Sequence, residues 1–360
     1  MDSKLYGTRL YVHRKSISQN IKYFQDSFPK IDIMAVVKAN AYGHGDIEFC
    51  QELKSNNIKL FSVADFEEGL RLRKVFSHIR IMVMNPGINN INTIVQNKLE
   101  PVIYNKRVMS EIISSTKKNN NTINVHVKLN TGMNRWGLNT EELIDVIKVL
   151  KQNKKITIQS IYSHLSSAKN PKLDSFSHNQ LNKLYSIKNC TGLIKHVFSS
   201  HGSLRLLEKN SDTQIIRLGL GIYGGLKHPN LEPVSELKCT INQIRTVKRG
   251  EGVGYNRSFI AANNTKVGVI AFGYADGIQR NWGNGLLKFY FQGKLLPTIG
   301  DISMDSCTID LSQAINICEG DELIYFGRER PIWKLAEELD TIPYEIIATL
   351  SRRIKRIYIN

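Results

Sequence analysis

Residues 35–45 read AVVKANAYGHG, and this stretch decides how the rest of the chain is interpreted. A hydrophobic run ends in Lys38, which is followed at once by small residues, an aromatic residue and two glycines. At the end of a parallel strand, a partly desolvated ammonium group loses some of its preference for the charged form. Lys38 could then form a Schiff base with an aldehyde such as pyridoxal phosphate. The alternative is a surface lysine that closes a strand.

Eight short apolar runs, separated by helical patterns, follow a first predicted helix over residues 16–28, where Ser16 and Gln19 are spaced as a capping box. The runs cover residues 31–37, 60–64, 79–84, 101–104, 123–129, 156–163, 196–200 and 213–218. Eight successive strand and helix units predict a parallel (β/α)8 barrel of the TIM type. Working residues of such barrels follow the carboxyl ends of the strands, and Lys38 falls at such an end.

The pattern changes beyond about residue 231 to period-two β runs with glycine-rich turns, interrupted by one predicted helix over residues 331–339. A chain of 360 residues with 41% hydrophobic residues fits two domains. The sequence therefore predicts an α/β protein, with an N-terminal barrel over residues 11–231 and a C-terminal mainly-β domain over residues 232–360.

Composition limits the possible partners of the chain. The net charge is +17, but the basic residues are spread along the chain, so we expect no nucleic-acid partner. The five cysteines are scattered without a CxxC pair, which predicts buried thiols and neither disulfides nor a metal site. No apolar run reaches the ~18 residues of a membrane span, and the first fifteen residues lack the apolar run of a signal peptide. The expected location is the cytoplasm.

Eight motifs in order resemble those of bacterial alanine racemases, which are pyridoxal-phosphate enzymes of fold type III. The motifs are VVKANAYGHG (36–45), KLNTGMNRWG (128–137), YSHLSSA (162–168), RLGLGIYG (217–224), VGYNRSF (253–259), GYADGIQR (273–280), ISMD (302–305) and TIPYE (341–345). The resemblance runs over nearly the whole chain. It implies the same two domains and adds that residues 1–10 pair with the C-terminal domain.

The resemblance assigns the catalytic residues. Lys38 carries the cofactor and is the base on one face of the substrate, and Tyr255 from the partner subunit is the base on the other face. His164 matches the family histidine near the cofactor ring and supports this tyrosine as a cationic or hydrogen-bonding group. Arg217 faces the pyridine nitrogen. Because a guanidinium keeps its protons, that nitrogen stays unprotonated and return of the proton to the α-carbon is favoured over transamination.

The same resemblance supplies the binding residues. The cofactor is held by Lys38, Tyr42, His164, Ser203, Arg217, Gly219, Leu220 and Tyr344. The substrate is bound by Arg135, Met304, Tyr274 and Asp305, with Arg280 also at the gate. In many family members the lysine matching Lys128 is carbamylated, so that it becomes an anion able to hold Arg135.

The chain departs from its family in the SSHGS segment, residues 199–203. Gly202 replaces an amide side chain, and Ser199 stands where a histidine often supports the pyridine-facing arginine. His201 could substitute for that histidine, and the sequence leaves this open. Asn130 replaces the family's common aspartate.

The resemblance implies an alanine racemase that interconverts L- and D-alanine, supplies D-alanine for peptidoglycan, and works as a homodimer with active sites shared between subunits. Two alternatives remain open at this stage. One is a racemase of serine or of a broader range of amino acids. The other is a noncatalytic pyridoxal-phosphate carrier, although known carriers of this barrel type lack the C-terminal β domain.

Overall fold

The computed structural model describes residues 7–187, 190, 192–208 and 212–360. The chain divides into two compact units. We call Ile21–Ala41 with Asp46–Gly221 the barrel unit. We call residues 7–20 with Tyr42–Gly45 and Ile222–Asn360 the β unit. Each unit is described by itself.

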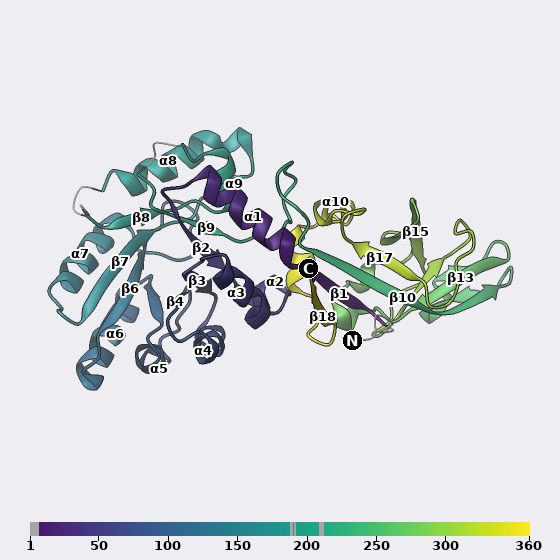
Figure 1. Cartoon of the computed structure of the whole chain (residues 1–360), viewed down its shortest axis with the longest axis horizontal. Coiled ribbons are helices and arrows are strands. Elements are labelled where there is room, and N and C mark those ends of the chain that lie inside the picture. Colours follow the sequence, from purple (N-terminus) through teal and green to yellow (C-terminus); the bar gives the residue numbers. More distant parts are fainter. Residues whose placement is uncertain (1–6, 188–189, 191, 209–211) are drawn as a thin grey trace. The chain divides into compact units, whose positions relative to one another are not determined.

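The barrel unit contains eight parallel strands in the order β8-β7-β6-β5-β4-β3-β2-β9 (Figure 1). They are β2 (Asp32–Val36), β3 (Leu60–Val63), β4 (Arg80–Val83), β5 (Glu100–Ile103), β6 (Ile123–Lys128), β7 (Ile156–Tyr162), β8 (Ile194–His196) and β9 (Ile215–Leu218). Between the end strands β8 and β9, one parallel bridge joins Ser199 to Arg217. The predicted (β/α)8 barrel of the TIM type is confirmed.

Helices follow the strands and cover the outside of the barrel, as α4 to α7 do in Figure 1. They are α1 (Arg14–Ser27), α3 (Asp46–Ser55), α4 (Phe66–Val75), α5 (Ile91–Gln96), α6 (Lys106–Asn119), α7 (Thr140–Lys151), the 3-10 helix η1 (Pro171–Leu173), α8 (Asp174–Tyr185) and α9 (Ser200–Arg205). Side chains cap four of them, since Asp65, Asn105, Asn139 and, at η1, Asn170 each accept a backbone N–H of the first turn.

The barrel interior combines an apolar layer with polar side chains. The apolar cluster comes from alternate positions of several strands and comprises Met34, Leu60, Met82, Val102, Tyr162 and Ile215. Such inward-facing layers are typical of the fold. Four polar side chains of the barrel strands, Ser62, His126, Ser160 and His196, are also fully buried.

Two predictions within the barrel are wrong in detail. The seventh strand is β8, residues 194–196 rather than 196–200, because the neighbouring β7 offers ladder partners only to these three residues. Ser200 instead begins α9. The first helix begins at Arg14, directly after a strand that ends at His13, so Ser16 lies inside the helix and forms no capping box.

The β unit contains an eight-stranded sheet in the order β13-β16-β15-β14-β17-β10-β1-β18, with β10 also paired to β13. Its strands are β1 (Arg9–His13), β10 (Ser235–Val247), β13 (Thr265–Ile270), β14 (Lys288–Phe291), β15 (Lys294–Ile299), β16 (Cys307–Asp310), β17 (Glu322–Phe326) and β18 (Lys355–Ile359). A short hairpin joins β11 (Gly252–Val253) to β12 (Phe259–Ile260). The predicted mainly-β domain is confirmed, and in it β1 pairs with both β10 and β18.

After Ile222, the described residues of the β unit form two α-helices where the sequence predicted one. Helix α10 (Ile332–Glu338) matches the predicted segment, with Pro331 as its N-cap. Helix α11 (Pro343–Ala348) was missed because its six residues are too few for a periodic pattern. Of the cysteines predicted to be buried, four are buried and Cys318 is exposed. Within the described ranges no helix is long and apolar enough to cross a membrane.

The segment after Lys38 forms a left-handed turn, α2 (Lys38–Tyr42). Ala39, Asn40, Ala41 and Tyr42 all have φ between +49° and +56°. Left-handed backbone costs L residues roughly 1–2 kcal/mol each, so other contacts must hold this turn. The Ala39 amide donates to the Glu68 carboxylate at 2.6 Å, and the Asn40 side-chain oxygen accepts the amide of Asp46 at 3.3 Å.

Gly43 ends the turn within the β unit. Its φ is +78°, and a Cβ atom there would lie 2.0 Å from the carbonyl oxygen of Ile347. The Gly43 carbonyl accepts a hydrogen bond from Arg356 at 2.8 Å. The glycine after Tyr42 is therefore required both by backbone conformation and by close packing.

We predict that Gly43→Ala lowers the free energy of unfolding by about 3 kcal/mol, because the added methyl group must displace backbone. Gly250→Ala is the matched control, since Gly250 has φ of +83° and open space around its Cβ position. It should cost only about 1 kcal/mol. Urea titration of both variants measures the difference, and equal losses would contradict this account of Gly43.

Candidate active site

Three basic side chains meet at the carboxyl ends of the barrel strands. Lys38 lies just beyond β2, Lys128 is the last residue of β6, and Arg217 lies in β9. Lys128 and Arg217 are only 7% and 3% exposed. Arg135 adds a fourth positive charge close enough to lower the pKa of both lysines.

This cation cluster lacks acidic partners. Among the described residues, no ion pair joins Lys128, Arg135 or Arg217 to a carboxylate. Burial, Arg135 and Arg217 lower the pKa of Lys128 to about 8. Burial and Arg135 also lower the pKa of Lys38, so a larger fraction of its amine is neutral and nucleophilic than in an exposed lysine.

Glu68 is the acidic group that acts on Lys38, and its effect is limited. Its two carboxylate oxygens accept the backbone amides of Ala39 and Ala64, at 2.6 and 2.8 Å. Burial raises the pKa of Glu68, which shows that its surroundings disfavour the charged form. Glu68 therefore holds the turn after Lys38 rather than neutralising the cluster.

Arg217 is held entirely by uncharged acceptors. Its guanidinium donates to Nδ1 of His196 at 2.6 Å, to the carbonyls of Ser163 and Val197 at 2.7 and 3.1 Å, and contacts Nδ1 of His164 at 3.3 Å. Burial lowers the pKa of Arg217 to about 10, so it stays protonated near neutral pH. A guanidinium has donors only, so this side chain presents N–H groups at the carboxyl ends of the strands.

The structure answers the question of the SSHGS departure. The histidine that supports Arg217 is His196, at the end of β8, and not His201. Sequence analysis missed His196 because it was assigned to the start of a longer strand. The sequence did offer one indication of His196, because it is the single histidine in the short, mainly apolar run just before the SSHGS segment.

His164 is a neutral hydrogen-bonding group rather than a cation. Burial, Arg217 and Lys128 lower its pKa to about 3. Of the two roles that the sequence allowed for His164, this lowered pKa favours the hydrogen-bonding one. Its Nδ1 faces the Arg217 guanidinium, which fixes the remaining ring proton on Nε2.

The predicted phosphate corner is built around a serine that the sequence did not single out. Ser200 accepts the backbone amides of Gly219 and Gly221 on its hydroxyl oxygen, at 3.2 and 3.1 Å. Ser203 is buried one helical turn later, and its hydroxyl donates to the Ser200 carbonyl at 3.1 Å. Leu220 is buried between the two glycines.

The remaining predicted residues belong to the β unit. The rings of Tyr42 and Tyr344 lie 5.8 Å apart, and Tyr223 lies 4.6 Å from Tyr42. Burial raises the pKa of Tyr344 to about 12, so its hydroxyl keeps its proton as a donor. The structure thus brings Tyr42 and Tyr344 together, as the family resemblance implied for a shared ligand.

The predicted second base, Tyr255, and two of the predicted gate residues are exposed in the single chain. Tyr255, in the 3-10 turn η3 (Tyr255–Arg257), is 67% exposed, and Tyr274 and Met304 are 40% and 54% exposed. A backbone hydrogen bond joins the segments of Tyr274 and Met304, since the Ala275 amide donates to the Met304 carbonyl at 3.0 Å. Asp305 pairs with Arg353 at 2.8 Å.

Arg280, also placed at the gate, pairs with Asp301 at 2.9 Å.

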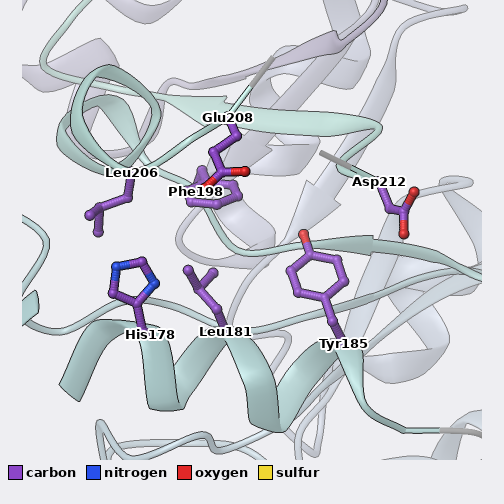
Figure 2. A pocket seen from close by; sticks show the side chains of 7 residues that line it. All are labelled: His178, Leu181, Tyr185, Phe198, Leu206, Glu208 and Asp212. Carbon is purple, nitrogen blue, oxygen red and sulfur yellow. The ribbon is translucent and has the colours of Figure 1, made fainter. Parts of the chain in front are cut away.

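A separate pocket of about 290 Å³ lies beside helix α8 of the barrel unit (Figure 2). Its lining residues are His178, Leu181, Tyr185, Phe198, Leu206, Glu208 and Asp212. None of the predicted site residues lines this pocket. Within the part of the chain that the structure describes, no group of three or more His, Cys, Asp or Glu side chains could hold a metal ion.

A lysine with a lowered pKa at the end of the first barrel strand, close to cations that form no ion pair among the described residues, suits an anionic aldehyde cofactor. The donors around it are amines, guanidinium groups, hydroxyls and backbone amides, which fit a phosphate ester and a phenolate oxygen. The fold and the site together define a pyridoxal-phosphate enzyme of the barrel class.

Comparison with known proteins names the family. The family model of the alanine racemase N-terminal domain matches residues 12–227, and that of the C-terminal domain matches residues 234–358. The chain is 35% identical to an alanine racemase of Helicobacter pylori (strain Shi470), over 97% of this chain and 98% of that protein. It is 30% identical to alanine racemase 2 of Bacillus subtilis (strain 168), over 97% and 93%. The chain belongs to the alanine racemase family.

Solved structures agree with this assignment. An alanine racemase of Clostridium difficile 630 superposes with a TM-score of 0.91 at 26% identity, over 99% of this chain and 96% of that one. An alanine racemase of Bartonella henselae with covalently bound pyridoxal phosphate gives a TM-score of 0.90 at 27% identity, over 99% and 100%. The family depends on pyridoxal 5'-phosphate, which agrees with the cofactor predicted from the sequence.

Proposed function

We propose that this chain interconverts L-alanine and D-alanine, using pyridoxal phosphate at Lys38 and two bases on opposite faces of the substrate. The observation that carries the proposal is the buried Arg217 guanidinium, which has neutral acceptors and, among the described residues, no carboxylate partner. Racemisation requires that the proton return to the α-carbon, and a donor-only group at the cofactor's ring nitrogen favours this outcome.

By family resemblance, the predicted binding residues would hold the cofactor. Lys38 supplies the amine, and Arg217 and His164 face the ring in this proposal. The phosphate would take hydroxyl and amide donors, which by family resemblance are those of Tyr42, Ser203, Gly219, Leu220 and Tyr344. When bound, pyridoxal phosphate supplies the electron-withdrawing system that acidifies the Cα–H bond of an amino acid.

Lys38 and Tyr255 would exchange the α-proton. Because burial and Arg135 lower the pKa of Lys38, its amine can accept a proton near neutral pH more readily than an ordinary lysine. Tyr255 is exposed and has no side-chain hydrogen bond among the contacts of the described residues. We infer that it serves the active site of a partner subunit, with His164 as the neutral group that orients it there.

Lys128 is the residue best suited to carbamylation. Carbon dioxide reacts with a neutral amine, the new N–C bond forms as one proton leaves for solvent, and the product is an anion. The lowered pKa of Lys128, about 8, increases the neutral fraction, and a carbamate would relieve the repulsion from Arg135 and Arg217. Arg135 would then be held for the substrate carboxylate.

The specificity for alanine would lie in the gate residues Tyr274, Met304 and Asp305, together with Tyr344. Large exposed side chains on neighbouring backbone segments support this role, because they could crowd a partner's active site and leave room for a methyl group. We further propose a homodimer, with residues 11–231 binding the cofactor and residues 232–360, joined by residues 1–10, supplying Tyr255. Residues 1–6 of this assignment lie outside the described residues. The five free cysteines suit a reducing compartment, so we place the enzyme in the cytoplasm, where D-alanine would serve peptidoglycan synthesis.

The activity is tested by incubating the purified protein with L-alanine and pyridoxal phosphate and following the circular dichroism signal to zero. Lys38→Ala should abolish labelling of the protein by borohydride reduction and lower activity by several orders of magnitude, because a covalent catalyst is lost. Lys54→Ala, an exposed lysine on α3, is the control and should retain both. A flat signal in the wild type would remove the proposal, and faster turnover of L-serine than of L-alanine would move it to a serine racemase.

A mixed-mutant experiment tests whether the two bases come from different chains. Lys38→Ala and Tyr255→Phe homodimers should each be nearly inactive. In a heterodimer with twofold symmetry, one site collects both lesions and the other collects none. Random exchange makes half of the dimers mixed, so activity should recover to about a quarter of the wild-type value. Absence of recovery, with heterodimers demonstrated by mass spectrometry, would place both bases on one chain.

A further inference from the structure

A continuous chain of hydrogen bonds crosses the barrel interior from Arg217 to the opposite ends of the strands. It starts with the 2.6 Å bond between Arg217 and Nδ1 of His196. Nε2 of His196 lies 2.8 Å from the Ser160 hydroxyl, which lies 2.7 Å from Nδ1 of His126. Nε2 of His126 lies 2.9 Å from a Glu100 carboxylate oxygen.

The far end of the chain is an ion pair. Arg80 donates from Nε and Nη2 to the two oxygens of Glu100, at 2.7 and 2.8 Å, and Asn124 adds a third bond at 3.1 Å. The Arg80 side chain is 40% exposed, whereas that of Glu100 is 4% exposed. Burial alone would raise the pKa of Glu100, but the bonds from His126 and Arg80 lower it to about 2. Glu100 is therefore an acceptor at any physiological pH.

The two ends of the chain fix the direction of every bond in it. Arg217 can only donate, so Nδ1 of His196 must accept and the ring proton of His196 lies on Nε2. That proton goes to the Ser160 oxygen, and the Ser160 hydroxyl then donates to Nδ1 of His126. The proton of His126 lies on Nε2 and is donated to Glu100. This assignment satisfies every donor and acceptor in the chain.

The reverse arrangement is excluded by the same distances. A proton on Nδ1 of His196 would face an N–H group of Arg217 at 2.6 Å, where two donors repel each other. Burial, Arg217 and His126 lower the pKa of His196 well below its usual value, so double protonation is also disfavoured. The Tyr162 ring stacks on His196 at 5.3 Å and 10°, which limits rotation of the imidazole.

Four of these groups have no role in the proposed chemistry, yet His126, Ser160 and His196 are 0% exposed and Glu100 is 3% exposed. Polar groups at such positions are costly unless every bond is made, and they specify geometry when every bond is made. Elsewhere in this barrel, the hydroxyls of Ser62 and Tyr162 lack partners among the described residues. Every polar group of the chain that ends on Arg217 has a hydrogen-bond partner, whereas these two hydroxyls do not.

We propose that Glu100, His126 and Ser160 are positioning residues that lock His196 in the Nε2-protonated tautomer and thereby aim the remaining Arg217 donors at the cofactor. The expected effect on catalysis rests on the proposed function, whereas the expected tautomer of His196 does not. Ser160 is the link to test, because its hydroxyl is the only group between the two imidazoles.

The test reads the histidine tautomers of the purified holoenzyme by ¹⁵N NMR after labelling its nine histidines. The His196 signals are assigned by their loss in a His196→Gln variant. In the wild type we expect unprotonated Nδ1 and protonated Nε2. Ser160→Ala should yield a mixture of tautomers, and kcat for alanine should fall about tenfold with little change in KM, as for loss of one buried hydrogen bond.

Two further variants separate positioning from general stability. Ser160→Thr keeps the hydroxyl and should restore the tautomer and kcat. Ser177→Ala removes another fully buried hydroxyl of the barrel unit, one without a hydrogen-bond partner among the described residues, and should leave both at wild-type values.

A wild-type His196 with a protonated Nδ1 would overturn the proposal even if no Ser160 variant folds. A folded Ser160→Ala that keeps the Nε2 tautomer and full kcat would also overturn it. If the wild type shows the expected tautomer but does not racemise alanine, the proposed function fails, whereas the proposed fixing of the His196 tautomer is supported.

Discussion

Burial of a guanidinium without a carboxylate is the constraint on which this structure depends. Arg217 lies in β9, is 3% exposed, and must direct several donors at acceptors that carry no charge. Backbone carbonyls of Ser163 and Val197 take two donors because the neighbouring strands end at that level. The imidazole of His196 takes another, and it can do so only while it is neutral.

The cations around Arg217 also bear on how the cofactor would bind. Lys38 and Lys128 have lowered pKa values because they share this buried, electropositive region. The positive charges of such a cluster repel one another when no anion is present, and they favour the binding of an anion. The arrangement that lowers the pKa of Lys38 would thus also attract the phosphorylated aldehyde of the proposed function.

Much of the fold could be read from the sequence, because eight apolar runs and their spacing report strands that are buried on both faces. The bounds of β8 could not, since a strand ends where its neighbour stops offering partners, and pairing is not visible within one segment. Lys38 was predicted from its place at a strand end, and Lys128 and Arg217 were predicted from the family resemblance. His196, Ser160 and His126 were missed because only the register between strands brings them into one line.

The central claim is that a donor-only arginine, held by neutral groups, commits the α-proton of alanine to return to carbon. The most direct measurement incubates the enzyme and pyridoxal phosphate with L-alanine in deuterated water, and follows the α-proton and pyruvate by ¹H NMR and the D-alanine by chiral chromatography. The account predicts that the α-proton signal disappears as D-alanine forms, without detectable pyruvate. Pyruvate formed at a rate comparable to that of D-alanine, or α-deuteration with no D-alanine, would contradict it.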